Sequence, residues 1–174
     1  NCYDGYLHVK PVVFWQQENL LQQYLPNLDR YIVLSDYDKR DYMEKLGIDC
    51  EVKINPRSFV SEKKCDVKSK RFLMATRFVY AKGLDLMMES FEEFCKEDSE
   101  WELDIIGDGD LFDQIRADAK KRHLEKRVHF VGYTNEPEKY YLNSSVFLLP
   151  SRWEGWPMVI MEAFEFGLDR KSTR

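Results

Sequence analysis

From residue 71 onward, short apolar segments alternate with amphipathic ones. Four apolar runs of β-rich composition predict strands at 71–76, 101–106, 127–131 and 145–149. The segment after the first run places apolar residues on one helical face, at Leu84, Met87, Met88, Phe91, Phe94 and Cys95. This alternation of strand and helix patterns is typical of βαβ units around a parallel sheet.

Three further helices are expected in the same part of the chain. One follows the second strand and has an apolar stripe formed by Leu111, Phe112, Ile115 and Ala119. Pro137 begins a short helix, and Pro157 begins an apolar helix that ends near Phe166, because proline suits the first helical turn. The segment 169–174 is polar, and we expect no strand there. The predicted sheet therefore has four strands.

The N-terminal segment has a sparser pattern. Strands are predicted at 12–15, 31–35 and 51–54, with a helix at 38–46 that ends at Gly47. The stretch from Asn55 to Lys70 is polar and rich in lysine, which is the composition of a linker. We interpret residues 1–58 as an incomplete α/β segment with its linker. Residues 59–174 are interpreted as an α/β domain with a Rossmann-like, doubly wound parallel sheet, truncated at its C-terminus.

Composition excludes several classes of protein. The 174 residues are 44% hydrophobic and 33% charged, which excludes a disordered or low-complexity chain. A net charge of -5 provides no global positive field for a nucleic acid, so an anionic ligand must meet a local basic cluster. The 4 cysteines have no C-x-x-C spacing and are read as free thiols in the cytoplasm. No apolar run is long enough to span a membrane.

Candidate binding residues follow the predicted strands, because open parallel sheets bind ligands beyond the carboxyl ends of their strands. Arg77 and Lys82 follow the first strand and precede a helix, where a cation is unfavourably placed unless it meets an anion. A phosphate group would meet both cations and the helix amides. The alternative is that both side chains are solvated surface charges.

The second strand ends in Gly107-Asp108-Gly109-Asp110, which is open to three interpretations. A dinucleotide fingerprint is disfavoured, because Phe112 replaces the third glycine. A D-x-D pair could hold Mn²⁺ or Mg²⁺ against a nucleotide diphosphate. We favour the third interpretation, in which the glycines allow close backbone approach to a ligand and one of the two aspartates caps the next helix.

The third and fourth strands end in further candidates. Tyr133 could present its ring and backbone to a planar base, or it could belong to a plain turn. Glu154 lies in the loop before Pro157, and Glu162 lies in the apolar helix that follows. A carboxylate in such a helix needs hydrogen-bond donors, and sugar hydroxyls would serve. The alternative partner of Glu162 is a structural lysine or arginine.

Four segments together resemble a known family. They are R-F-V-Y-A-K-G from Arg77, G-D-G-D from Gly107, V-H-F-V-G-Y from Val128 and P-S-R-W-E-G-W-P-M-V-I-M-E-A from Pro150. This set resembles the nucleotide-sugar-binding half of the GT-B glycosyltransferases, and most closely the retaining glycosyltransferase family 4, the group 1 glycosyl transferases. Its E-x7-E pattern matches Glu154 and Glu162. The resemblance covers about residues 71–168.

The resemblance implies a role for each matched position. Arg77 and Lys82 would stabilise the departing diphosphate, and Glu154 would position the donor sugar, which makes these three the implied catalytic residues. The implied donor-binding residues are Gly107, Gly109, Tyr133, Gly155, Trp156 and Glu162. Among them Glu162 would hold the ribose hydroxyls. The family needs no metal, which disfavours the D-x-D interpretation of Asp108 and Asp110.

The expected function is therefore transfer of a hexose from a UDP or GDP sugar to a saccharide or lipid-linked acceptor. The resemblance implies retention of anomeric configuration, no obligatory cofactor or metal, and a place in surface polysaccharide biosynthesis. A lipid-linked acceptor would bring the full-length cytoplasmic protein to the inner face of the membrane. Most of the acceptor domain is missing, so this fragment alone is expected to be inactive. The alternatives are a non-catalytic nucleotide-binding module and a GT-B nucleotide-sugar epimerase.

Overall fold

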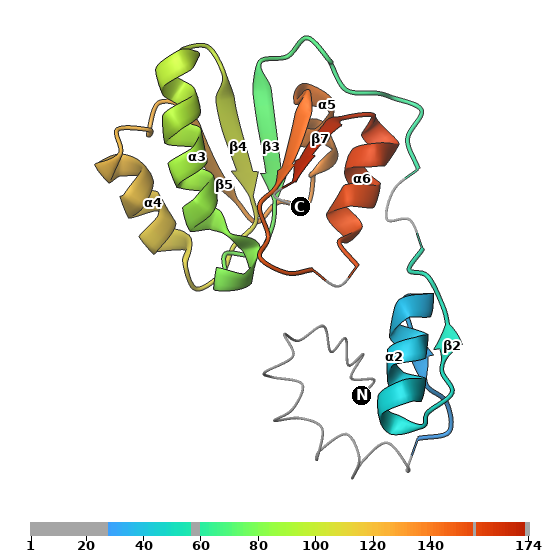
Figure 1. Cartoon of the computed structure of the whole chain (residues 1–174). Coiled ribbons are helices and arrows are strands. Elements are labelled where there is room, and N and C mark those ends of the chain that lie inside the picture. The colour runs from blue at the N-terminus through green and yellow to red at the C-terminus, as the bar shows by residue number, and fades with distance from the viewer. Residues whose placement is uncertain (1–27, 57–59, 155, 173–174) are drawn as a thin grey trace. The chain divides into compact units, whose positions relative to one another are not determined.

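The chain divides into two compact units, Asn1–Pro56 and Arg57–Arg174 (Figure 1). The computed structural model describes residues 28–56, 60–154 and 156–172. In the first unit, β1 (Ile32–Val33) and β2 (Glu51–Val52) pair in parallel and are joined by α2 (Asp36–Leu46). Ser35 caps this helix at its start and Gly47 ends it in a left-handed conformation. The strand predicted at 12–15 lies outside the described residues.

The second unit is a parallel sheet with helices on both faces, which confirms the predicted fold class. Its elements are β3 (Arg71–Ala75), η2 (Tyr80–Lys82), α3 (Leu84–Glu97), β4 (Glu102–Ile106), α4 (Phe112–Lys121), β5 (Val128–Gly132), α5 (Glu138–Asn143), β6 (Val146–Leu149), α6 (Met158–Phe166) and β7 (Asp169–Ser172). The strand order is β5-β4-β3-β6-β7, and every neighbouring pair is parallel.

The expectation of no strand at 169–174 was wrong. β7 pairs in parallel with β6, with Asp169 opposite Val146 and Ser172 opposite Leu149. The backbone N–H of Asp169 donates to the carbonyl of Ser145 at 3.0 Å. A ladder of backbone hydrogen bonds does not require apolar side chains, and charged residues are typical of strands at a sheet edge. The hydropathy pattern therefore could not reveal this strand.

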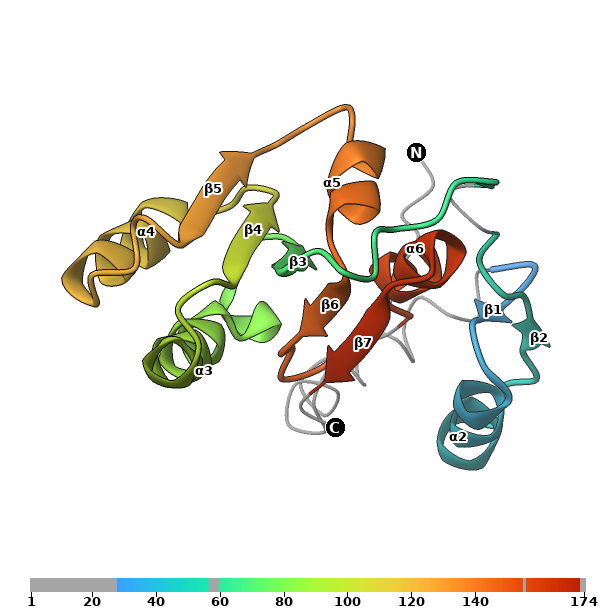
Figure 2. The same cartoon turned by 90° about the horizontal axis from the view of Figure 1, so that it is seen from above.

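Alternate residues of strands β3 to β6 pack into two cores on opposite faces of the sheet. Met74 of β3 belongs to the core under α3 and α4, together with Met88 and Phe91. Its neighbour Leu73 belongs to the core under α5 and α6, with Tyr141 and Phe166 (Figure 2). This alternation follows from the two-residue period of a strand. Within the described residues, the helices are too short or too polar to span a bilayer.

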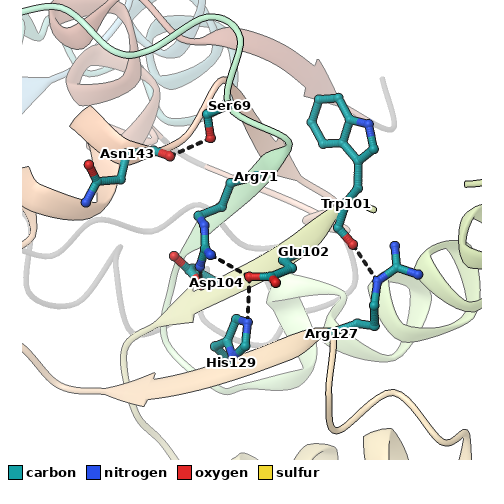
Figure 3. Close-up of polar contacts among 8 residues, drawn as sticks. All are labelled: Ser69, Arg71, Trp101, Glu102, Asp104, Arg127, His129 and Asn143. Carbon is teal, nitrogen blue, oxygen red and sulfur yellow. Dashed lines mark hydrogen bonds and ion pairs between the residues drawn. The ribbon is translucent and has the colours of Figure 1, made fainter. Parts of the chain in front are cut away.

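A charged network joins the beginnings of three strands (Figure 3). The guanidinium of Arg71 donates to Asp104 Oδ1 at 2.8 Å and also pairs with Glu102. His129 Nε2 lies 2.9 Å from the Glu102 carboxylate. Asp104 is buried on the central part of the sheet, and burial raises its pKa despite the opposing attraction of Arg71. Arg71 is therefore the counter-charge that makes a carboxylate tolerable at this position.

The loops that follow β3 and β6 meet at Gly83. This residue has φ +65°, and a Cβ there would lie 2.2 Å from the carbonyl oxygen of Pro150. The backbone N–H of Arg152 donates to Ala81 O at 2.8 Å. The guanidinium of Arg152 binds both carboxylate oxygens of Asp85, at 2.7 and 2.6 Å. Backbone contact and a bidentate ion pair therefore hold the two loops together.

Replacing Arg71 with methionine should lower the free energy of unfolding by about 2 kcal/mol at pH 7, because the buried Asp104 carboxylate loses its counter-charge and Arg71 is itself partly exposed. The folded-state pKa of Asp104 is raised, so its protonation favours the folded state at acid pH. The deficit of the variant should therefore shrink as the pH falls through that pKa. Urea unfolding at several pH values measures this deficit.

Lys70→Met is the matched control for that substitution, because Lys70 forms an exposed ion pair with Glu100, which precedes β4. An exposed pair contributes little, so this variant should stay close to the parent at every pH. Equal losses in the two variants, or a loss in Arg71→Met that does not change with pH, would contradict the role given to Asp104.

Gly83→Ala should destabilise the chain more than Gly132→Ala. Both glycines have positive φ, +65° and +78°, so alanine carries a left-handed strain of about 1 kcal/mol at either position. A Cβ at Gly132 meets nothing within 4 Å, whereas one at Gly83 meets backbone, which adds about 1–3 kcal/mol. Thermal unfolding compares the two variants, and equal losses would show that the two loops are not in contact.

Candidate functional site

A cavity of about 380 Å³ opens at the carboxyl ends of β3 and β6. It is lined by residues from the loops after these strands and from α5 and α6, among them Arg77, Lys82, Tyr141, Glu154, Trp156 and Glu162. All except Tyr141 were predicted from the sequence as site residues. The parallel sheet brings together positions that are distant in the chain, such as Arg77 and Glu162, which lie 85 residues apart.

Lys82 and Glu154 form an ion pair at the wall of the cavity. Lys82 Nζ lies 2.8 and 2.7 Å from the two carboxylate oxygens of Glu154, and the Ser151 hydroxyl donates to Oε1 at 2.5 Å. The two side chains are only 20% and 17% exposed. Lys82 is the last residue of η2 and immediately precedes Gly83, the N-cap of α3. The anion expected beside this cation is thus provided by the chain itself.

Arg77 is the second cation of the cavity, and its side chain is exposed. Among the described residues, its guanidinium has no hydrogen bond or ion pair. The backbone around it is fixed, because Phe78 N–H donates to Asp108 O and Thr76 N–H donates to Ile106 O, both at 2.9 Å. Arg77 is therefore a cation on a rigid loop, with its donors available to an anion in the cavity.

Glu162 projects from α6 and accepts a hydrogen bond from a tyrosine. The Tyr141 hydroxyl donates to Glu162 Oε2 at 2.6 Å. Tyr141 is fully buried, and its ring stacks with those of Phe147 and Phe166 at centroid distances of 6.0 and 5.2 Å. The alternative in which Glu162 pairs with a structural lysine or arginine is not found among the described residues. Burial and the nearby Glu162 carboxylate raise the pKa of Tyr141.

The glycines of the G-D-G-D segment approach backbone and not the cavity. Gly107 and Gly109 have φ +125° and +150°. A Cβ at Gly107 would lie 1.8 Å from Thr76 O, and one at Gly109 would lie 2.9 Å from Phe78 N. The sequence predicted a close approach to a ligand, and in the structure the atoms close to both glycines belong to the loop that carries Arg77. These two glycines therefore position a cavity residue without lining the cavity themselves.

The helix cap predicted for this segment was wrong. Leu111 is the N-cap of α4, and no side chain caps the helix there. The Asp108 carboxylate instead accepts from the adjacent backbone N–H of Gly109 at 2.8 Å. Among the described residues, no group of three or more His, Cys, Asp or Glu side chains could hold a metal ion.

Tyr133 and Gly155 complete the predicted set. Tyr133 follows β5, is 78% exposed and does not line the cavity. Gly155 lies outside the described residues. Sequence reasoning missed Tyr141, Ser151 and Arg152 as residues that organise the site. Ser151 and Arg152 stand in the motif that contains Glu154, so their position was a usable signal, whereas Tyr141 is indistinguishable from a core aromatic residue.

Solved structures with the same fold include glycosyltransferases. A mutant of Staphylococcus aureus TarM crystallised with UDP superposes with a TM-score of 0.77 and 21% identity, over 90% of this chain and 32% of that protein. This likeness shows the Rossmann-like fold of the GT-B glycosyltransferases.

Sequence relatives of the chain carry glycosyltransferase names. An uncharacterised glycosyltransferase of Haemophilus influenzae is 30% identical over 142 residues, which are 80% of this chain and 40% of that protein. A lipopolysaccharide 1,6-galactosyltransferase of Salmonella typhimurium is 31% identical over 101 residues, which are 56% of this chain and 28% of that protein. The chain thus spans less than half the length of either relative.

The family match covers the unit that contains the cavity. Residues 58–169 match the family model of the glycosyl transferases group 1. This range includes the loops after β3 and β6 and both helices that line the cavity. Because the match extends over more than half of the chain, the chain belongs to the group 1 glycosyl transferases.

Proposed function

We propose that this chain is the donor-binding part of a hexosyltransferase that takes its sugar from a UDP or GDP sugar. The observation that carries the proposal is the convergence of Arg77, Lys82, Glu154 and Glu162 on one cavity at the strand ends. Two cations for a diphosphate and two carboxylates for sugar hydroxyls are the groups that a nucleotide sugar requires. The UDP bound by the TarM mutant supports this donor class.

Arg77 and Lys82 would act on the diphosphate. As the bond to the sugar breaks, negative charge grows on the departing nucleotide, and preorganised cations stabilise that charge. Two cationic side chains can perform this task without a metal ion, and we propose that no metal is obligatory. Lys82 would exchange the Glu154 carboxylate for a phosphate oxygen when the donor binds. The released carboxylate would then be available to the sugar.

Glu154 would position the hexose together with the backbone of Gly155 and Trp156, and Glu162 would accept hydrogen bonds from the ribose. Tyr133, with its ring exposed beyond β5, would meet the base. Gly107 and Gly109 would contribute by holding the Arg77 loop. The E-x7-E spacing of Glu154 and Glu162 carries the further proposals of membership in family 4 and of transfer with retention.

The acceptor is proposed to be a saccharide or a lipid-linked saccharide of a surface polysaccharide. The name of the Salmonella relative, a lipopolysaccharide galactosyltransferase, supports this class. Residues 1–58 would belong to the acceptor-side domain and residues 59–174 to the donor side. Turnover would require the acceptor side as well, so we propose that this chain alone binds the donor without transferring the sugar. The full-length protein would act in the cytoplasm, at the inner face of the membrane when the acceptor is lipid-linked.

Calorimetric titration of the chain with UDP, GDP and ADP in the presence of EDTA tests the donor site. We expect one nucleotide to bind, and Arg77→Ala to weaken its binding about 10-fold or more, because a charge-assisted contact with the diphosphate is lost. Arg116→Ala is the control, since Arg116 is an exposed arginine on α4 outside this cavity. Absence of binding to a folded chain, or equal effects of the two variants, would overturn the proposal.

Glu154→Gln should have opposite effects on a nucleotide and on its sugar conjugate. Glutamine removes the charge that holds Lys82, so UDP alone should bind a few-fold more tightly. The affinity gained by adding the sugar should fall, because the carboxylate that positions the sugar is lost. Titration with UDP and UDP-glucose compares the two ligands, and a variant that binds UDP more weakly would contradict the exchange proposed for Lys82.

A further inference from the structure

We infer that Tyr141 is a positioning residue of the donor site, which holds the Glu162 carboxylate in place for the ribose hydroxyls. This inference rests on the function proposed above, because it concerns how the same cavity meets its nucleotide. Tyr141 carries no charge and does not belong to the segments that resemble the family. Its assignment comes from its contact with Glu162 and from its burial.

The ring of Tyr141 is held by two other aromatic rings. It projects from α5 and is fully buried, and the stacked rings of Phe147 and Phe166 lie at interplanar angles of 18° and 14° to it. These two partners come from β6 and α6. The hydroxyl of a ring packed in this way cannot follow a moving partner. The hydrogen bond of 2.6 Å therefore fixes Glu162, and not the reverse.

The direction of this hydrogen bond is set by electrostatics. Burial and the Glu162 carboxylate raise the pKa of Tyr141, so the phenol keeps its proton and acts as the donor. Glu162 Oε2 accepts this hydrogen bond, while Oε1 has no hydrogen bond within the described part of the chain. Both residues line the cavity. The Glu162 carboxylate is therefore an oriented hydrogen-bond acceptor in the cavity. Such an acceptor suits a ligand whose hydroxyl groups donate hydrogen bonds.

An anchored glutamate binds a ligand better than a mobile one. A free glutamate side chain has several rotatable bonds, and a ligand must immobilise them on binding. The hydrogen bond from Tyr141 removes part of this entropy loss before the nucleotide arrives, which is preorganisation of the site. The benefit is confined to ligand groups that contact Glu162. It should therefore depend on the ribose hydroxyls and not on the diphosphate.

The test compares UDP with 2′-deoxy-UDP, or the guanosine pair if GDP is the nucleotide bound. We expect the parent chain to prefer UDP, and Tyr141→Phe to weaken UDP binding about 3- to 10-fold with little change for 2′-deoxy-UDP. Glu162→Gln should lose the preference as well, and the double variant should be no worse than Glu162→Gln alone. Tyr140→Phe, a neighbour on the same helix, is the control and should keep the parent's preference.

A second variant changes the hydrogen bond between Tyr141 and Glu162 at the glutamate. Glu162→Asp keeps the charge but withdraws the carboxylate from Tyr141 by one methylene, without touching the buried ring. It should lose the preference for UDP to a similar degree. If Tyr141→Phe does not fold, an unchanged preference in Glu162→Asp would still overturn the inference.

The outcomes separate this inference from the proposed function. Equal weakening of both nucleotides in Tyr141→Phe would mean a merely structural role and would overturn the inference. An unchanged preference in Tyr141→Phe or Glu162→Asp would also overturn it, while binding that still depends on Arg77 would leave the donor site standing. Failure of the parent chain to bind any nucleotide would overturn both.

Discussion

The closeness of Gly83 to the Pro150 carbonyl is the constraint on which the site depends. A side chain at this position would separate the loops after β3 and β6, and these loops carry both cations and Glu154. The bidentate contact of Arg152 with Asp85 and the pair of Lys82 with Glu154 span the same junction. Gly83 has no chemical function of its own. It nevertheless determines how far apart the charged side chains lie that we propose to contact the donor diphosphate and sugar.

Sequence patterns predicted the elements with strong hydropathy signals and missed one that has none. The strands that begin at Arg71 and Glu102 are buried on both faces, so their apolar runs are visible in the sequence. β7 is held by backbone hydrogen bonds to β6, and its D-R-K-S sequence carries no such signal. The cap predicted for α4 was also wrong: the Asp108 carboxylate accepts from the adjacent Gly109 N–H, and local sequence does not tell this contact from a helix cap.

The charged residues of the cavity could be predicted from the sequence, whereas a buried side chain that supports one of them could not. Arg77 and Lys82 could be identified because charges next to a helix N-terminus need an explanation. Tyr141 lies in a short amphipathic helix, and its pattern is that of a core residue. Only the fold reveals that its hydroxyl reaches Glu162, 21 positions further along the chain. The contact between α5 and α6 depends on how the chain crosses from β5 to β6. The local sequence does not specify the path of that crossover.

We propose that the cavity between the two loops holds the nucleotide diphosphate. Mapping of backbone amide chemical shifts during titration of the isotope-labelled chain with UDP in EDTA tests it most directly. We expect the largest chemical-shift changes at Gly83, Glu154 and Glu162, and no change at the far edge of the sheet around Lys120 and His129. Shifts confined to that far edge, or no shifts at all, would contradict it.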